Sequence, residues 1–459
     1  MALAGCAGPR PAPPASAAVE APVDWRTDIA GPRQAIGAQW WNGFGDPVLG
    51  RLEARALAGN PDLALAAARI DEARAQFALA RAQLNPQIGG SAGASGGQSL
   101  SPFGTASDAV SAQPGLSISY DLDLFGRLRL ASRAAQAQLL ASKGARDTVR
   151  LALVSSVASG YVTLRGLDQR LAIAQATATG RAEALRIARR RAETGYTSAL
   201  ELHQAEAEFA ATQQLIAQAQ LAIARQENAL SLLLGENPTA IERGIPIDRL
   251  SAPPLPDGLP ADVLRRRPDI FQAEQALVAA DRSLDSARAA FLPNLTLTGT
   301  AGVVLSTALS SPVGVFALGG SILAPIFSGG RLEAQQGVAA ARRDQAAFAY
   351  RKAALSAFRE VEDGLAGVTR TGQQQAALES QRRALAAGLN NATNRYRAGY
   401  SPYLEQLDAQ RGLLSAELAL VQARTDRLLA FVSLYQALSG GWSVADVCQG
   451  EPGGCAVRR

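Results

Sequence analysis

The stretch Leu295-Thr296-Leu297-Thr298-Gly299-Thr300-Ala301-Gly302-Val303 alternates apolar side chains with polar or small ones. Because successive side chains of a β-strand point to opposite faces, this alternation predicts a strand with one apolar and one polar face. Residues 116–122 alternate in the same way. About ten such residues match the length of a tilted strand that crosses a bilayer, so both stretches are typical of membrane-barrel strands.

The segments around both stretches contain very few charged residues. Residues 291–330 contain no Asp, Glu, Lys or Arg, and residues 82–120 contain only Asp108. A transmembrane helix over 299–327 is the alternative, but Pro312, Pro325 and many glycines and serines oppose it. We therefore reject the helix and expect two pairs of strands, at 86–97 with 114–124 and at 293–305 with 315–326.

The two strand pairs belong to a duplicated unit. Asn60-Pro61-Asp62 returns as Arg267-Pro268-Asp269 after 207 residues, and Gly195-Tyr196 returns as Gly399-Tyr400 after 204 residues. Chance matches would not keep this order along the chain. We therefore expect two copies of one unit.

Each copy reads as helix, two strands, long helix, turn and returning helix. No proline occurs between Pro114 and Pro238 or between Pro325 and Pro402, so the helices after the strands can be long. Each long helix covers 67 residues, about 100 Å at 1.5 Å per residue. The expected helices of the first copy (61–235) are 61–84, 127–193 and 198–234, and those of the second copy (268–440) are 268–291, 331–397 and 402–438.

The remaining segments join or flank the two copies. Residues 236–267 are rich in proline, which interrupts helices, so we expect an equatorial linker there, together with an equatorial segment at 31–60 and a C-terminal tail at 441–459. Residues 1–30 read as a lipid anchor and a Pro/Ala-rich tether, because Leu-Ala-Gly-Cys at 3–6 is the pattern at which bacterial lipoproteins are cleaved and acylated, for instance with palmitate. An ordinary cysteine in a terminal tail is the alternative for Cys6.

The composition favours helices and argues against several functions. The chain is 47% hydrophobic but only 5% aromatic, and Ala and Leu carry most of the apolar fraction, which suits long, closely packed helices. The 45 Lys and Arg residues are mixed with 40 Asp and Glu residues, which gives little support to nucleic-acid binding.

Few residues of the chain could serve a metal site or a catalytic site. One histidine and three cysteines are too few ligands for a typical metal site, so we expect no cofactor. We find no catalytic constellation and expect no enzyme. Cys448 and Cys455 either form a disulfide or remain free thiols.

Four strands per chain are too few to close a barrel. Lipid tolerates no open sheet edge, because each unpaired backbone group there costs several kcal/mol. Three chains would supply a 12-stranded barrel and a 12-helix tunnel. We therefore expect a mainly α fold with a membrane β-barrel part, completed as a homotrimer.

Three motifs carry a resemblance to a known family. Residues 40–49 (Trp-Trp-Asn-Gly-Phe-Gly-Asp-Pro-Val-Leu), 60–63 and 264–270 (Leu-Arg-Arg-Arg-Pro-Asp-Ile) resemble the TolC-like outer-membrane efflux proteins, and more closely the NodT-type lipoproteins that serve resistance-nodulation-division pumps. The resemblance covers nearly the whole chain, from residue 6 to about residue 442.

The resemblance implies a trimeric channel in the outer membrane of a Gram-negative bacterium. It would be lipid-anchored, extend into the periplasm, and passively conduct drugs or other small toxic solutes outward through an iris-like gate. Its partners would be a periplasmic adaptor and an inner-membrane resistance-nodulation-division transporter. A type I protein-secretion duct and a periplasmic coiled-coil adaptor are the alternatives.

Candidate gate residues lie near the two interhelical turns, which we expect at the tips farthest from the membrane. Glu405 and Asp408 stand three residues apart, so both carboxylates lie on one helix face near its N-terminus, where the helix dipole favours negative charge. A solvated helix start is the alternative for this pair.

The resemblance assigns roles to four positions near these turns. It places Glu405 and Asp408 at the gate-carboxylate positions, Glu201 at the acidic position of the first hairpin, and Tyr396 at the gate tyrosine. Ser401 stands where a basic residue is expected, which puts an arginine lock in doubt. Arg395 or Arg397 is the candidate substitute.

Overall fold

The computed structural model describes residues 9–27, 33–34, 37–100, 102–104, 106–256, 260–444 and 447. The chain divides into two compact units. The first comprises Met1–Val19, Ala67–Gly144 and Ile270–Ala353, and the second comprises Glu20–Ala66, Ala145–Asp269 and Ala354–Arg459. The acylation site expected at Cys6 and the possible disulfide between Cys448 and Cys455 lie outside the described residues.

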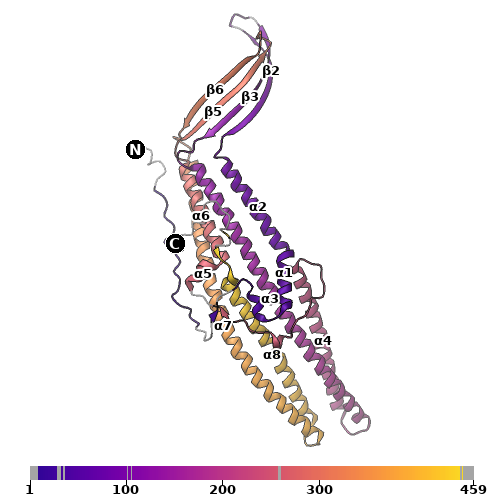
Figure 1. Cartoon of the computed structure of the whole chain (residues 1–459). Coiled ribbons are helices and arrows are strands. Elements are labelled where there is room, and N and C mark those ends of the chain that lie inside the picture. Colours follow the sequence, from indigo (N-terminus) through magenta and orange to yellow (C-terminus); the bar gives the residue numbers. More distant parts are fainter. Residues whose placement is uncertain are drawn as a thin grey trace. The chain divides into compact units, whose positions relative to one another are not determined.

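Two copies of the expected unit follow one another along the chain (Figure 1). The first consists of α2 (Pro61–Ala82), β2 (Gln87–Leu100), β3 (Ala106–Asp121), α3 (Arg127–Glu193) and α4 (Ala199–Leu234). The second consists of α6 (Pro268–Ala289), β5 (Asn294–Ser306), β6 (Val313–Leu323), α7 (Arg331–Arg397) and α8 (Tyr403–Ala437). The long helices α3 and α7 both contain 67 residues. The predicted order of helices and strands within the duplicated unit is confirmed.

The helix boundaries follow local chemistry. Both α2 and α6 begin at a proline. Proline has no backbone N–H, and this costs nothing in the first turn, where N–H groups have no acceptor within the helix. Asn60 precedes α2, and its Oδ1 accepts the backbone N–H of Asp62 at 2.9 Å. The turns after α3 and α7 contain Gly195 and Gly399 with φ of 71° and 79°, the left-handed conformation that favours glycine.

The four long strands form one antiparallel sheet in the order β2-β3-β5-β6 (Figure 1). The register aligns Ile88, Ile118, Gly299 and Leu318 across one face, and the residues next to them in sequence, including Ser117 and Thr300, across the other. Ile88 and Leu318 are 72% and 86% exposed in the single chain. The sheet therefore has an uncovered apolar face, as the alternation predicts.

Strands β5 and β6 occupy most of residues 299–327, where the sequence analysis rejects a transmembrane helix. Among the described residues, no helix combines the length and the hydropathy that crossing a membrane requires.

The strand boundaries differ from the sequence prediction by one to eight residues, and the largest difference is at the start of β3. Strand β3 begins at Ala106 rather than at residue 114, because Pro114 does not end the strand as expected. Pro114 lies inside β3, opposite Ala92 of β2. The pairing of β3 with β5 is interrupted at residues 113–114, which accommodates a proline that has no N–H to donate. Strand β6 ends at Leu323 rather than at residue 326, because Pro325 follows it.

Two short helices occur where the sequence predicts only connecting segments. They are α1 (Pro47–Gly59) and α5 (Pro260–Arg266), and both begin at a proline. The Asp46 carboxylate caps α1 by accepting the Val48 N–H at 2.9 Å, and it also accepts the Tyr161 hydroxyl at 2.7 Å. Its Oδ2 accepts the Ile245 N–H at 3.1 Å as well. This buried carboxylate therefore joins the equatorial segment, α3 and the linker within the second unit.

The proline-rich N-terminal tether packs on helices of the first unit. Arg343 of α7 is 2% exposed, and its guanidinium donates to the carbonyls of Pro11 and Ala12 at 2.9 and 3.0 Å. Arg10 lies 2.6 Å from Asp281 and 3.0 Å from Asp285 of α6. These contacts fix the path of the tether along α6 and α7.

Candidate functional site

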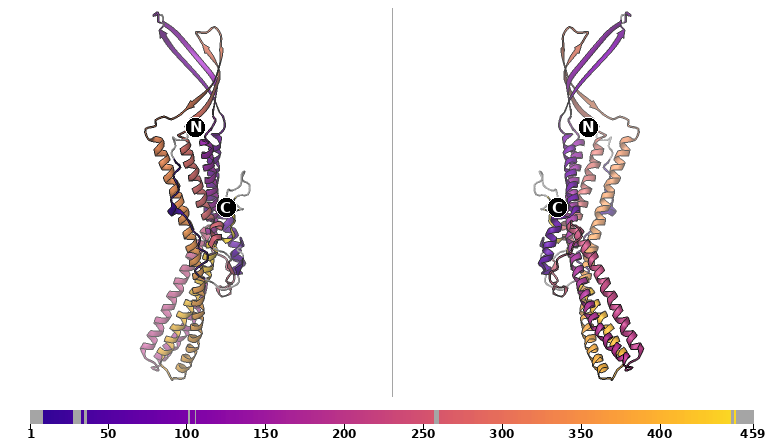
Figure 2. Two further views of the ribbon diagram at one scale, coloured as in Figure 1. Left: turned by 90° about the vertical axis from the view of Figure 1, so that its left-hand side faces the viewer. Right: turned by 90° about the vertical axis from the view of Figure 1, so that its right-hand side faces the viewer.

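The predicted gate residues belong to two helical hairpins of the second unit (Figures 1 and 2). Hairpin 1 is formed by α3, the turn at 194–198 and α4. Hairpin 2 is formed by α7, the turn at 398–402 and α8. Near the predicted gate residues, the two hairpins contact each other through polar side chains at two levels.

The first level, the tip contact, consists of Arg191, Glu201 and Tyr396. The hydroxyl of Tyr396 in α7 donates to the Glu201 carboxylate in α4. The same hydroxyl accepts Nη1 of Arg191 in α3 at 2.8 Å. The Arg191 guanidinium also lies 5.4 Å from the centre of the Tyr396 ring, which is within the range of a cation–π interaction. One tyrosine of hairpin 2 is thus held by both helices of hairpin 1.

The tyrosine is in the protonation state that the tip contact needs. Burial, followed by the hydrogen bond and the charge of Glu201, raises the pKa of Tyr396. The Tyr396 hydroxyl therefore keeps its proton at neutral pH and donates it to Glu201.

An apolar layer lies next to the tip contact. Ala188, Ala205, Tyr403 and Leu407 form a buried cluster, and Tyr396 packs against it. The rings of Tyr396 and Tyr403 are 5.6 Å apart with an interplanar angle of 57°. This packing keeps water from the aromatic part of the contact.

The second level, the inner contact, consists of Arg181, Glu208 and Arg411. Nη2 of Arg181 in α3 lies 2.8 Å from Oε2 of Glu208 in α4. Nε of Arg411 in α8 donates to Oε1 of the same carboxylate at 2.7 Å. The inner contact is therefore a carboxylate held between two guanidiniums, one from each hairpin.

The structure brings together only some of the predicted gate residues. Glu201 and Tyr396 are in direct contact, whereas Glu405 and Asp408 of α8 pair with other side chains. Glu405 is 3.5 Å from Nε of Arg395, and Asp408 is exposed and 4.0 Å from Nη1 of Arg411. The two acidic residues of α8 thus remain partly solvated in the single chain.

Sequence reasoning named Arg395 as a candidate but missed Arg191 of the tip contact and the two arginines of the inner contact. Arg395 pairs with Glu405, but the basic partner of Tyr396 is Arg191 of the other hairpin. A signal was present, because Arg191 is the counterpart of Arg395 at the repeat distance of 204 residues. Arg181, Glu208 and Arg411 have no comparable signal, since their pairing depends on how the two hairpins pack.

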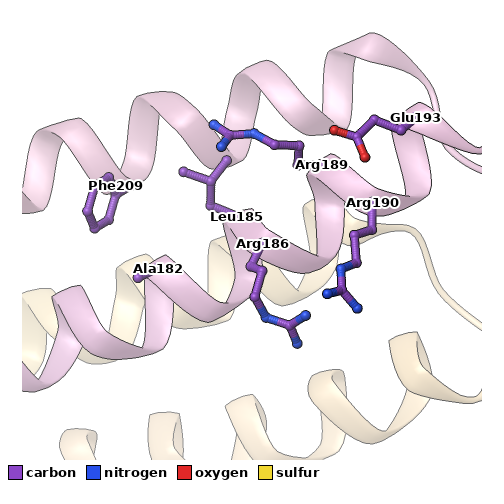
Figure 3. Close-up of a pocket in the computed structure, with 7 residues that line it drawn as sticks. All are labelled: Ala182, Leu185, Arg186, Arg189, Arg190, Glu193 and Phe209. Carbon is purple, nitrogen blue, oxygen red and sulfur yellow. The ribbon is translucent and has the colours of Figure 1, made fainter.

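A surface pocket of about 320 Å³ lies on hairpin 1 (Figure 3). Figure 3 shows Arg186 and Arg190 extending to the same side of α3. Arg186 pairs with Glu183, and Arg189 lies 3.7 Å from Glu206. The residues that line the pocket are Ala182, Leu185, Arg186, Arg189, Arg190, Glu193 and Phe209.

Comparison with known proteins identifies the family. Residues 52–236 and 259–440 match the family model described as outer membrane efflux protein. The chain is 37% identical over 415 residues to the solvent efflux pump outer membrane protein SrpC of Pseudomonas putida, covering 88% of this chain and 87% of the relative. It is 35% identical over 410 residues to the probable outer membrane lipoprotein SilC of Salmonella typhimurium, covering 88% of each.

A solved structure shows the same fold. The open state of the MtrE outer membrane channel of Neisseria gonorrhoeae superimposes with a TM-score of 0.81 at 34% sequence identity, covering 93% of this chain and 96% of the other. The chain belongs to the outer membrane efflux protein family.

Membership of this family confirms several predictions. The chain is an outer-membrane component of an efflux system, as its relatives are, and its location in the outer membrane of a Gram-negative bacterium is confirmed. The alternative of a periplasmic coiled-coil adaptor is wrong, because the family model covers both copies of the repeat.

Proposed function

We propose that this chain forms the outer-membrane duct of a tripartite pump and that the tip contact keeps its periplasmic end closed. The observation that carries the proposal is the Tyr396 hydroxyl, which joins hairpin 2 to both helices of hairpin 1. The hairpins cannot separate at this level without breaking two hydrogen bonds to charged groups. Such bonds contribute about 1.5–3 kcal/mol each, which the docking of a partner protein can offset.

The sheet supports a trimeric channel. Strands β2 and β6 are the edges of the four-stranded sheet, so in the part of the chain that the structure describes each pairs on one side only. Edges exposed to lipid are strongly unfavourable because their backbone groups find no hydrogen-bond partners. Pairing β6 of one chain with β2 of the next, three times, completes a 12-stranded barrel.

The same proposal assigns the partners and the anchor. A periplasmic adaptor and an inner-membrane resistance-nodulation-division transporter supply the substrate and the energy, while the duct conducts drugs or other small toxic solutes passively. Acylation of Cys6 anchors the chain, and the docked tether at residues 10–12 carries the anchor along the helices. Around a threefold axis, Glu405 and Asp408 form acidic rings that attract cations.

Single-channel recording in planar bilayers tests the gate. We expect Tyr396→Phe, which removes both hydrogen bonds of the tip contact, to raise the open probability at least about tenfold. Glu201→Gln replaces a charged acceptor with a neutral one and should raise the open probability less. The matched control is Tyr400→Phe, because Tyr400 is 80% exposed at the turn of hairpin 2 and should leave gating unchanged. Variants that stay as closed as the unaltered protein would refute the gate.

A second recording tests the acidic rings, and a cellular assay tests efflux. The double variant Glu405→Ala, Asp408→Ala should lose the cation preference of the channel. Deletion of the gene should lower tolerance to small toxic solutes. Unchanged tolerance together with lost protein export would favour the secretion duct instead.

A further inference from the structure

The inner contact lies at a different height from the tip contact. Glu208 follows Glu201 by seven residues on α4, about 10 Å along the helix at 1.5 Å per residue. The buried cluster around Tyr403 and Leu407 includes Ala205, which stands between these two glutamates on α4. The two contacts are therefore separate polar levels with an apolar layer between them.

The inner contact is built asymmetrically. The side chains of Arg181 and Glu208 are 7% and 11% exposed, whereas that of Arg411 is 53% exposed. Arg181 also donates to the Glu208 backbone carbonyl at 2.8 Å and to Oγ1 of Thr212 at 2.7 Å. Arg181 is thus fixed to α4 by three acceptors, and among the described residues only the hydrogen bonds from Arg411 join this contact to hairpin 2.

This asymmetry suits reversible release. When Arg411 leaves, the Glu208 carboxylate keeps Arg181 as its partner, so no unpaired charge is left buried. Arg411 is already half exposed and returns to water at little cost. The bond between Glu208 and Arg411 can therefore break and reform while hairpin 1 keeps its structure.

The second copy of the repeat shows that hairpin packing does not require this contact. At the repeat distance of 204 residues, Arg181 and Glu208 correspond to Leu385 and Gly412. A Cβ atom added to Gly412 would lie 3.3 Å from Cδ2 of Leu385, so apolar close packing replaces the ion pair in hairpin 2. The charges are therefore a special feature of the contact between hairpin 1 and α8.

We infer that Glu208 and Arg411 form a second latch that holds the two hairpins together, independent of the tip contact, and that Arg181 is a positioning residue for Glu208. The inference rests on the proposed gate. Two latches at different heights resist both separation and tilting of hairpin 2, whereas a single contact at the tip resists only separation there.

Planar-bilayer recording of the purified full-length protein tests the latch. Arg411→Gln should raise the open probability about tenfold, and Arg411→Lys should restore most of the closure because it keeps the charge. The combination with Tyr396→Phe should multiply the two single effects, because separate contacts add in free energy. The matched control is Arg186→Gln. This variant removes an exposed ion pair with Glu183 on α3 of hairpin 1 and should leave gating unchanged.

The dependence of the open probability on ionic strength is a further measurement, and a purely structural role of Arg411 would not affect it. Salt screens the half-exposed Arg411, so the open probability of the unaltered protein should rise with salt, and this dependence should be weaker in Arg411→Gln. For the positioning role, Arg181→Met should open the channel and Arg181→Lys should restore closure.

The outcomes separate the latch from the gate. If Arg411→Gln gates like the unaltered protein while Tyr396→Phe opens the channel, the latch is refuted and the gate stands. If neither variant opens the channel, the proposed gate itself is refuted. If Arg411→Gln does not assemble, an open probability of the unaltered protein that is independent of salt refutes the latch.

Discussion

At the scale of single residues, the least expected feature is a buried carboxyl on α1. Glu53 is fully buried, and neither of its carboxylate oxygens has a hydrogen-bond partner among the described residues. Its neighbours on the same helix face, Leu49 and Ala56, are apolar and buried. Burial raises the pKa of Glu53 from 4.5 to about 9, so this side chain is neutral at pH 7.

This buried carboxyl predicts a pH-dependent stability. Between the unfolded pKa of 4.5 and the folded pKa of about 9, the unfolded chain releases a proton that the folded protein retains. The free energy of unfolding should therefore fall as pH rises, by at most about 1.4 kcal/mol per pH unit. Thermal unfolding of the purified protein between about pH 5 and pH 8 measures this slope.

Variants of Glu53 isolate its contribution. Glu53→Leu should unfold at a higher temperature at pH 8 and show a flatter dependence on pH, because no proton is released at this site on unfolding. The exposed Glu72→Gln on α2 serves as the control and should keep the original slope. An equal slope in Glu53→Leu and the unaltered protein would show that Glu53 is not protonated when folded.

At the scale of the helical hairpins, the turns depend on one glycine each. Gly195 and Gly399 have positive φ, which a side chain with a Cβ rarely adopts, so alanine at either position should destabilise its hairpin by about 1 kcal/mol. Gly388 is the matched control, because it lies inside α7 with open space around its Cβ position. Gly388→Ala should stabilise the helix by about 1 kcal/mol.

Circular dichroism melting of the three variants distinguishes these effects. The two turn variants should unfold at lower temperatures and the helix variant at a higher one. A shift in the same direction for all three would mean that the turn conformation does not limit hairpin stability.

At the scale of the whole molecule, the apolar face of the sheet has to meet lipid. Leu318 and Ser321 lie on the same strand and point to opposite faces, since they are three residues apart. Leu318→Arg should cost about 2–4 kcal/mol in the membrane, whereas Ser321→Arg should be tolerated on the polar face. The amount of heat-resistant oligomer in outer-membrane fractions measures both, and equal loss for the two variants would contradict the assignment of the faces.

Local patterns predict most of the elements. Proline spacing and two periodicities predict the long helices and the four strands, because proline breaks hydrogen bonding wherever it occurs and side-chain alternation reflects the pleat. The starts of β3, α1 and α5 were not predicted, because each involves a proline whose effect depends on its position. Pro114 lies where the pairing of β3 with β5 is interrupted, and Pro47 and Pro260 begin helices instead of ending them.

The amino-acid sequence by itself determined the duplicated unit, the amphipathic strands, the tip positions of Glu201, Tyr396, Glu405 and Asp408, and a sheet too small to close alone. Only the tertiary structure decided which side chains meet, such as Arg191 with Tyr396 and Arg411 with Glu208, and that Glu53 has no hydrogen-bond partner within the described part of the chain. The physical reason is that helix periodicity depends on neighbours three or four residues away, whereas the partner of a charge on a helix face depends on how two hairpins, distant in sequence, pack together.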